Sequence, residues 1–330
     1  MSVRSRLSQI LHYVLSVRNP YMFLYRTFHY LNRDVPLRRA GLIFDKNKSD
    51  YYKNGFKDLI IETYDGSGQL VHPDMIKSDG TMWFVATPYP YGMEEYENPS
   101  IYNITDADSF IPHTCPISKQ SCRTQGTHLS DPAFVNVGPE LYCIFRSTED
   151  RKVNHLFRSK YDSVRDEWGH PEVFYSSDDD LLLSPAPVCD GSKIVMYHAD
   201  WNEGTGHLYR AVFSRDFVFE QSREVSVNGL PEGYSIWHQA VRYISENDRI
   251  SGLKGLFLVK KKRESNDCRL YYSESHDDGF TWDLKDEVSI PNDIDSVMKY
   301  PYKSCFIPDS DGLILSWVDK SGRYRLIRLN

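Results

Sequence analysis

The feature that most constrains this chain is a unit that recurs five times after about residue 60. Each unit has a polar or proline-containing start, an apolar strand, a glycine-bearing or acidic turn and an aromatic strand. The units begin at His72-Pro73-Asp74, Ser130-Asp131-Pro132, Leu183-Ser184-Pro185, Ile236-Trp237-His238 and Tyr302-Lys303-Ser304, at spacings of roughly 50 to 65 residues. A single four-stranded sheet cannot bury both of its faces, whereas a radial array buries each sheet against its neighbours. The repeat therefore predicts a closed five-bladed β-propeller.

Composition supports an all-β protein, because the 330 residues include 23 tyrosines and 16 phenylalanines, and aromatic side chains favour strands. Ring closure is expected through pairing of residues 59–62 with the last unit near residues 324–327, which hides two sheet edges. A two-domain sandwich is the main competing architecture.

Charge and cysteine usage exclude some functions. The net charge of −7 provides no broad cationic field for nucleic acid, and the basic run at residues 260–263 is interpreted as a solvated hairpin end. Cys115 and Cys122, with His113 and His128 nearby, match no recognised ligand spacing, so no metal site is predicted.

The chain divides into an N-terminal amphipathic helical segment over residues 1–40 and the propeller over residues 41–330. Leu7, Ile10, Leu11, Val14 and Leu15 follow helical spacing, and the segment is rich in arginine. It is expected either to bind a membrane surface or protein partner, or to pack on the propeller with its arginines in water. Its apolar run lacks a signal-peptide cleavage pattern, which predicts a cytoplasmic protein, with phage or envelope association as the alternative.

Innermost strands of all blades begin at one face of the central channel, so residues at equivalent unit starts should converge there. The side chains expected around this shared cavity are Asp74, Asp131, Ser184, His238 and Lys303. Asp74 and Asp131 are taken to be equivalent repeat positions, and a turn-capping role is the alternative for each.

Over residues 68–330 the chain resembles the five-bladed propellers of glycoside hydrolase family 43 and the related β-fructosidases. The resemblance depends on the ordered motifs HPD, TPYP, YENPSI, SDP, LSP and WH. In addition, residues 275–282 (SHDDGFTW) match the Asp-box turn of sialidases, to which we assign a structural role.

This resemblance implies glycosidic cleavage by two carboxyl groups. It assigns Asp74 as the base and Asp131 as the residue that orients the acid. Family members carry the acid as a glutamate in the third blade, where this sequence has Ser184-Pro185. The substitutes considered are Glu97, Asp200 and Glu203.

Aromatic and polar residues beside the motifs are candidates for substrate binding, because sugar rings stack on aromatic faces. The candidates are His72, Tyr89, Tyr91, Tyr96, Arg146, Ser184, Trp201, Trp237, His238 and Lys303. No cofactor is predicted. Some relatives hold calcium in the channel, but no oxygen-rich loop of recognised spacing occurs in this sequence.

The predicted function is therefore binding of a polysaccharide or oligosaccharide in the central channel, with hydrolysis by a glycoside hydrolase mechanism. The missing third-blade glutamate favours a second hypothesis, a noncatalytic carbohydrate-binding or assembly module of a polysaccharide-synthesis or phage-tail system. Sugar transfer is a third.

Overall fold

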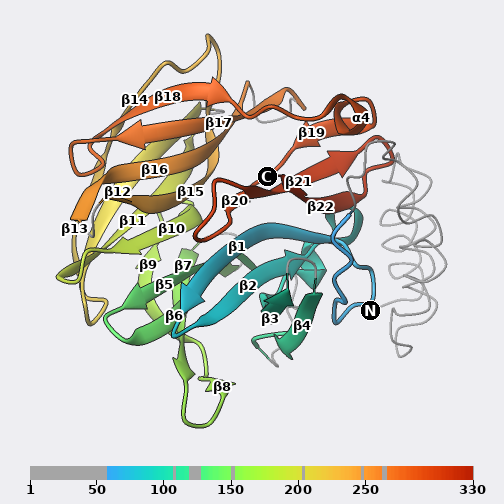
Figure 1. The fold of residues 1–330 in the computed structure, drawn as a ribbon. Coiled ribbons are helices and arrows are strands. Elements are labelled where there is room, and N and C mark those ends of the chain that lie inside the picture. Colours follow the sequence, from blue (N-terminus) through green and yellow to red (C-terminus); the bar gives the residue numbers. More distant parts are fainter. Residues whose placement is uncertain are drawn as a thin grey trace, which may run out of the picture.

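Five sheets, one from each predicted unit, surround a common centre (Figure 1). The computed structural model describes residues 58–106, 109–118, 128–149, 153–202, 205–246, 249–261 and 266–329. The predicted helical segment at residues 1–40 lies outside these ranges. No helix in the described ranges is long and apolar enough to cross a membrane.

The first three sheets, called blades 1 to 3, follow the chain order outward from the centre. Blade 1 contains β1 (Leu70–Ser78), β2 (Thr81–Pro88), β3 (Ser100–Asp106) and β4 (Ser109–Thr114), with two short 3-10 helices at Pro90–Gly92 and Glu94–Tyr96. Blade 2 contains β5 (Leu129–Val137), β6 (Glu140–Glu149), β7 (Val153–Asp162), β8 (Glu167–Trp168) and β9 (Glu172–Ser177). Blade 3 contains β10 (Leu183–Cys189), β11 (Lys193–Asn202), β12 (Thr205–Ser214) and β13 (Phe219–Glu224).

The last two sheets are blades 4 and 5. Blade 4 contains β15 (Ser235–Glu246), β16 (Arg249–Lys260), β17 (Cys268–Ser275) and β18 (Thr281–Glu287), with β14 (Ser226–Asn228) at its outer edge. Blade 5 contains β19 (Met298–Pro301), β20 (Cys305–Phe306), β21 (Leu313–Asp319) and β22 (Tyr324–Leu329), and the short helix α4 (Asn292–Asp295) precedes it. The predicted all-β, five-bladed propeller is confirmed.

The aromatic strand expected in each unit pairs with the innermost strand of its blade. These aromatic strands are β2, β6, β11, β16 and β21. The first hairpin closes at Asp79-Gly80, where both residues have positive φ, as a two-residue turn between right-twisted strands requires. Ring closure is also confirmed, because Asp58 forms an antiparallel bridge with Ile327 and Leu59 N donates to Leu326 O at 2.8 Å.

The hydrophobic core is divided among the blade interfaces. One cluster of buried side chains fills each of the five contacts between neighbouring blades, including the contact between blades 5 and 1. Burial on both faces explains why every blade reads as runs of Val, Ile, Leu and aromatic residues. The side chains at the channel are consequently held by a rigid ring.

The segment predicted to be an Asp-box forms the turn between β17 and β18. Asp277 Oδ1 accepts hydrogen bonds from Phe280 N at 3.1 Å and Thr281 N at 2.9 Å, and Trp282 is fully buried. Its place on the outer hairpin of blade 4 keeps it away from the channel.

Candidate functional site

A cavity of about 480 Å³ opens at the centre of the propeller and receives side chains from every blade. Its volume is in the range of small-molecule sites. It is lined by His72, Tyr89, Glu94, Glu97, His128, Ser130, Asp131, Arg146, Thr148, Asn154, Leu181, Leu183, Trp201, Trp237, His238, Lys260 and Tyr302. Eight of the fifteen site residues expected from the sequence are in this set.

Bulges in the innermost strands aim the central side chains. The register of blades 1, 2 and 3 shifts at Val71/Asp74, Ser130/Ala133 and Leu183/Ala186. Each bulge contains one residue of positive φ, and these are His72 (54°), Asp131 (54°) and Ser184 (50°). Each of the three is followed by proline, which cannot donate to the sheet ladder, so the strand is interrupted where the side chain must turn to the axis.

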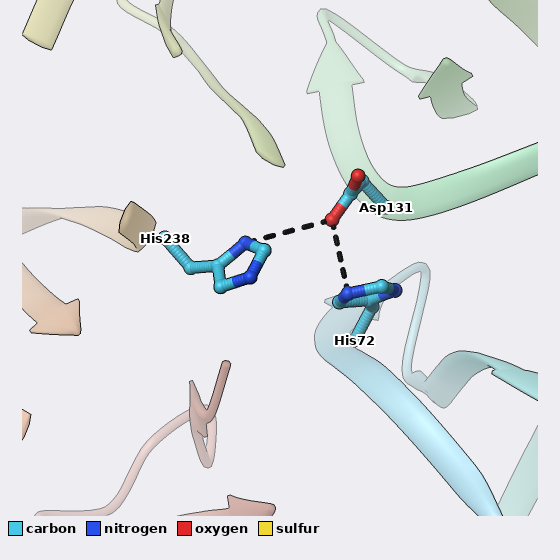
Figure 2. A group of neighbouring side chains, drawn as sticks. All are labelled: His72, Asp131 and His238. Atoms are coloured by element: carbon cyan, nitrogen blue, oxygen red, sulfur yellow. Dashed lines mark ion pairs between the residues drawn. The ribbon is translucent and has the colours of Figure 1, made fainter. Parts of the chain in front are cut away.

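Asp131 is at the centre of the hydrogen-bond network of the site and is 1% exposed. Its Oδ2 accepts from Arg146 Nε at 2.9 Å and Ser130 Oγ at 3.2 Å, and its Oδ1 accepts from Ser184 Oγ at 2.9 Å. His72 Nε2 lies 3.3 Å from Oδ1, and His238 Nδ1 lies 3.7 Å from the same oxygen. Figure 2 shows both imidazole rings next to the same oxygen of the carboxylate.

Burial alone would raise the pKa of Asp131, but the surrounding side chains, among which the Arg146 guanidinium carries a permanent charge, outweigh it and hold the pKa well below its ordinary value. Burial lowers the pKa of His72 to about 3 and that of His238 well below its ordinary value. Both rings are therefore neutral at pH 7, and Arg146 is the permanent cation that keeps Asp131 ionised.

The hydrogen-bond network assigns the tautomer of His238. An ionised Asp131 accepts the Ser184 hydroxyl proton, so the Ser184 oxygen, which also contacts His238 Nδ1, accepts the Nδ1 proton. His238 Nε2 then carries a lone pair. It is buried and has no hydrogen-bond partner within the described part of the chain.

His72 is arranged in the same way. Thr87 Oγ1 donates to Val71 O at 3.4 Å and lies 3.3 Å from His72 Nδ1, which makes Nδ1 the protonated nitrogen. His72 Nε2 therefore turns a lone pair toward the Asp131 carboxylate oxygen, and the geometry of that contact is not a hydrogen bond. Two electron-rich atoms at 3.3 Å repel each other unless a cation lies between them.

These three residues can hold a metal ion, since each offers one ligand atom within 4.8 Å of the other two. The separation of 3.3 Å between His72 Nε2 and Asp131 Oδ1 is close to the value of about 3.4 Å for neighbouring ligands of a tetrahedral zinc site. Two imidazole nitrogens and one carboxylate suit a transition metal better than calcium, which prefers oxygen ligands. The three residues come from blades 1, 2 and 4, which is why no local spacing in the sequence could reveal the cluster.

Glu97 is the second carboxyl group deep in the cavity and is 4% exposed. Burial, and then the negative charge of Asp131, raise its pKa well above the ordinary value. Glu97 Oε1 lies 3.7 Å from His72 Nδ1, and Oε2 lies 3.7 Å from His128 Nε2. Glu97 thus retains a proton under conditions in which Asp131 is ionised.

Asp74 does not line the cavity. Its Oδ2 accepts from Phe134 N at 2.7 Å, and its Oδ1 pairs with Arg242 Nη2 at 2.5 Å, which joins blades 1, 2 and 4 in the channel wall. The expected equivalence of Asp74 and Asp131 is wrong, because the bulges align Asp131 with His72 and Asp74 with Ala133. Aligning the units on Pro73 and Pro132 would have given the correct correspondence.

Five other expected residues do not line the cavity. Ser184 is fully buried and acts through Asp131 and His238, as described above. Lys303 is 2% exposed, its Nζ donates to Pro132 O at 3.3 Å, and burial lowers its pKa. Asp200 Oδ1 accepts from Leu181 N at 3.1 Å. Tyr91 and Tyr96 are both buried in the loop between β2 and β3. Glu203 lies outside the described residues.

Several lining residues were missed by sequence reasoning. Lys260 was assigned to a solvated basic run, but it is 9% exposed and its Nζ lies 3.9 Å from the centroid of the Trp237 ring, so that interpretation is wrong for this residue. Thr148 and Asn154, at the ends of β6 and β7, hydrogen-bond to each other at 2.9 Å beside Arg146. Position at the inner end of a strand was the signal that could have indicated both.

Comparison with known proteins tests the fold. No family model matches the sequence, and no curated protein is detectably similar to it. Among solved structures, an N-acetylgalactosamine deacetylase from F. plautii in complex with blood group B trisaccharide aligns with a TM-score of 0.63 and 17% identity, over 80% of this chain and 90% of that one. A thermostable family-43 glycoside hydrolase aligns with a TM-score of 0.57 and 10% identity, over 79% and 90%.

The chain has the five-bladed propeller fold of these enzymes. A GH43_1 enzyme from Xanthomonas citri gives the same result, with a TM-score of 0.58 and 11% identity over 83% of this chain and 89% of that one. The likeness to family-43 propellers expected from the motifs is therefore confirmed for the fold, and identities this low carry no reaction across with it.

Proposed function

We propose that this protein is a glycan-acting hydrolase in which His72, Asp131 and His238 hold a divalent metal, and that it removes an acyl group from a saccharide bound in the central cavity. The observation that carries the metal is the approach of the His72 Nε2 lone pair to the Asp131 carboxylate at 3.3 Å without a hydrogen bond. The unpartnered His238 Nε2 beside them supports the same assignment.

A metal held by these residues would act as a Lewis acid and would lower the pKa of a water molecule bound to it to about 7. Arg146 and Ser184 keep Asp131 ionised and oriented, and Thr87 and Ser184 fix the imidazole tautomers. Glu97, protonated by burial and the neighbouring charge, would give its proton to the departing amine nitrogen or alkoxide oxygen as the bond to the acyl carbon breaks. Aromatic rings of Trp237, Tyr302 and Tyr89 line the cavity and would stack on a sugar ring.

Ordinary glycosidic cleavage fits this site less well. The carboxylate implied as its base, Asp74, is occupied by Arg242 and the Phe134 amide outside the cavity. Blade 3 contributes only Leu181, Leu183 and Trp201 to the cavity among the described residues, so none of these supplies the third-blade acid. The structural neighbours include both a deacetylase and glycoside hydrolases. The proposed removal of an acyl group agrees with the activity named for the deacetylase.

Two measurements on the full chain test the proposal. Metal content after purification, and calorimetric titration of chelator-treated protein with Zn²⁺ and Mn²⁺, should give one metal per chain. Acetate release from N-acetylated and O-acetylated oligosaccharides should require that metal. His72→Ala and His238→Ala should abolish both properties. His155→Ala changes a half-buried histidine of β7 outside the cavity and should preserve them. Failure of the wild-type protein to bind either metal would overturn the metal assignment.

A second candidate, glycosidic cleavage with Glu97 as acid and Asp131 as the ionised carboxylate, is favoured by the opposite shifts of their pKa values. Release of reducing ends without acetate from the same oligosaccharides would establish this reaction in place of deacylation. Binding without either product would establish the noncatalytic carbohydrate module.

A further inference from the structure

Tyr302, between β19 and β20 of blade 5, lines the cavity next to the two histidines of the candidate metal site. The centroid of its ring lies 5.3 Å from that of His72 and 5.0 Å from that of His238. Trp237 packs against the same ring at 5.1 Å and at right angles, and Tyr324 packs against it at 5.5 Å. The Tyr302 ring is therefore fixed from several sides before any ligand arrives.

The hydroxyl group of Tyr302 is open to a ligand. It makes no hydrogen bond within the described part of the chain, and it is not among the buried polar atoms that lack a partner there, so it is accessible. The residue is 7% exposed and borders the cavity. Ser130 and Thr148 also bring hydroxyl groups to the cavity, but they donate their protons to Asp131 Oδ2 at 3.2 Å and to Asn154 Oδ1 at 2.9 Å. The proton of the Tyr302 hydroxyl is not used in this way.

The Tyr302 hydroxyl keeps its proton at neutral pH. An ordinary tyrosine has a pKa of about 10. Burial raises the pKa of Tyr302 well above this value, and Tyr89 and Asp131, which line the same cavity, raise it further. The side chain is consequently a neutral hydrogen-bond donor beside the two imidazole rings.

Removal of an acyl group places negative charge on one atom, the carbonyl oxygen. Hydroxide adds to the carbonyl carbon, and the π electrons of the C=O bond move to this oxygen. When that electron pair returns, the bond from the carbon to the amine nitrogen or alkoxide oxygen breaks, and the departing atom takes the proton of Glu97. The products are the carboxylic acid and the free amine or alcohol. The ionised Glu97 regains a proton from the next water molecule, which leaves a new hydroxide.

We infer that Tyr302 is a catalytic residue of this reaction, whose hydroxyl donates a hydrogen bond to the acyl carbonyl oxygen as that oxygen becomes negative. The inference rests on the proposed deacylation for the identity of the reaction. It adds a role for blade 5, which gives no residue to the candidate metal site. A donor fixed in place stabilises the transition state more than the ground state, because the hydrogen bond strengthens as the charge develops.

Tyr302→Phe tests this role, because it removes the hydroxyl and keeps the ring against both histidines. The probes are N-acetylgalactosamine and an analogue in which a methylphosphonyl group replaces the acetyl group and mimics the tetrahedral intermediate. Tyr302→Phe should lower kcat for acetate release by about 100- to 1000-fold and leave KM nearly unchanged. It should weaken calorimetric binding of the analogue by about the same factor. Its affinity for Zn²⁺ should equal that of the wild type.

Two further variants separate the hydroxyl from the ring. Tyr197→Phe removes the hydroxyl of a buried blade 3 tyrosine outside the cavity, which donates to Asp278 O at 3.4 Å, and it should keep the wild-type kcat and analogue affinity. Tyr302→Leu removes the ring as well and should also lower the affinity for Zn²⁺, because the two imidazole rings lose a packing partner. A purely structural Tyr302 would give full activity in Tyr302→Phe and a loss only in Tyr302→Leu.

Failure of this inference differs from failure of the proposed reaction. Acetate release and analogue binding at wild-type levels in Tyr302→Phe would overturn the role of the hydroxyl and leave deacylation standing. Absence of acetate release by the wild-type protein would refute the reaction, and the analogue would still decide the role of the hydroxyl. Binding of the analogue that weakens in Tyr302→Phe would retain Tyr302 as a donor to a tetrahedral anion, whereas equal binding, or no binding to the wild type, would refute that as well.

Discussion

His72 of blade 1 and Asp131 of blade 2 are equivalent residues, each with φ of 54° and each followed by proline. Positive φ is disfavoured for these residue types, and more so before proline, at a cost of roughly 1–3 kcal/mol each. Ser184 repeats the arrangement in blade 3 with φ of 50°. The three strained residues occupy equivalent bulges of neighbouring blades, and the packing of those blades holds them in place. The contacts between them can be tested directly.

Arg146→Met should destabilise the protein strongly, because it leaves the Asp131 carboxylate buried without the guanidinium at 2.9 Å. Removing one partner of a buried ion pair costs about 3–5 kcal/mol, which urea unfolding would measure. The matched control is Lys193→Met, which breaks the exposed pair with Glu220 and should cost less than about 1 kcal/mol. Equal losses in the free energy of unfolding of the two variants would show that Arg146 does not stabilise the buried Asp131 carboxylate.

Ser184→Ala should weaken metal binding without unfolding the protein. The Ser184 hydroxyl is the partner of both Asp131 Oδ1 and His238 Nδ1, so its removal frees the imidazole to change tautomer. Loss of such an orienting group typically lowers metal affinity about 10- to 100-fold. Calorimetric titration with Zn²⁺, accompanied by circular dichroism, provides the measurement. Ser192→Ala, in the exposed turn between β10 and β11, should bind metal like the wild type.

Asp65, which does not line the cavity, should make the free energy of unfolding depend on pH. Burial raises its pKa, and Oδ2 has no hydrogen-bond partner among the described residues. The native state therefore holds a proton that the unfolded state has lost above about pH 4, and stability falls as pH rises through the native pKa. Asp65→Asn should remove this decline and give a higher Tm at neutral pH.

Melting curves from pH 4 to pH 8 would test this prediction. The exposed substitution Asp286→Asn should leave the pH profile of the wild type unchanged. A wild-type profile parallel to that of Asp65→Asn over the whole range would contradict the assignment.

Arg325→Met should loosen the closure of the ring. Arg325 Nε donates to Asp319 Oδ2 at 2.8 Å and Nη1 pairs with Asp58, the residue that bridges to Ile327. Without the guanidinium, Asp319 is buried and unpaired, at a cost of about 3–5 kcal/mol. Hydrogen exchange should accelerate at residues 58–61 and along β22. Arg328→Met removes a neighbouring arginine that has no ion-pair partner in the described ranges, and it should leave exchange at residues 58–61 slow.

The fold was largely predictable because its signals are local. Each blade hairpin places an apolar strand, a turn and an aromatic strand next to one another in sequence, as in residues 70–88. Repetition then limits the architecture to a ring, since every sheet needs a neighbour on both faces. The extra short strands β8, β14 and β19 escaped prediction because they are brief edge or bulged segments without alternation.

The site was only partly predictable. Asp131, His72 and His238 were selected as residues at unit starts, but their assembly into one cluster depends on which bulge residue of each blade turns to the axis. Asp74 shows the limit of sequence reasoning. It is only two positions from His72 in the sequence, yet its side chain lies in the channel wall, where Arg242 from blade 4 neutralises it. Lys260 reads as part of a basic run and is buried over Trp237.

The sequence by itself determined the number of blades, the positions of their inner hairpins and the segments that pair to close the ring, because hydrophobic alternation and turn chemistry act between neighbours in the chain. Only the tertiary structure decided which side chains meet at the axis, which imidazole nitrogens keep a lone pair, and which carboxyl group keeps a proton. Those properties depend on burial and on charges contributed by residues of other blades, and Coulomb and desolvation energies are set by distance in space rather than by separation along the chain.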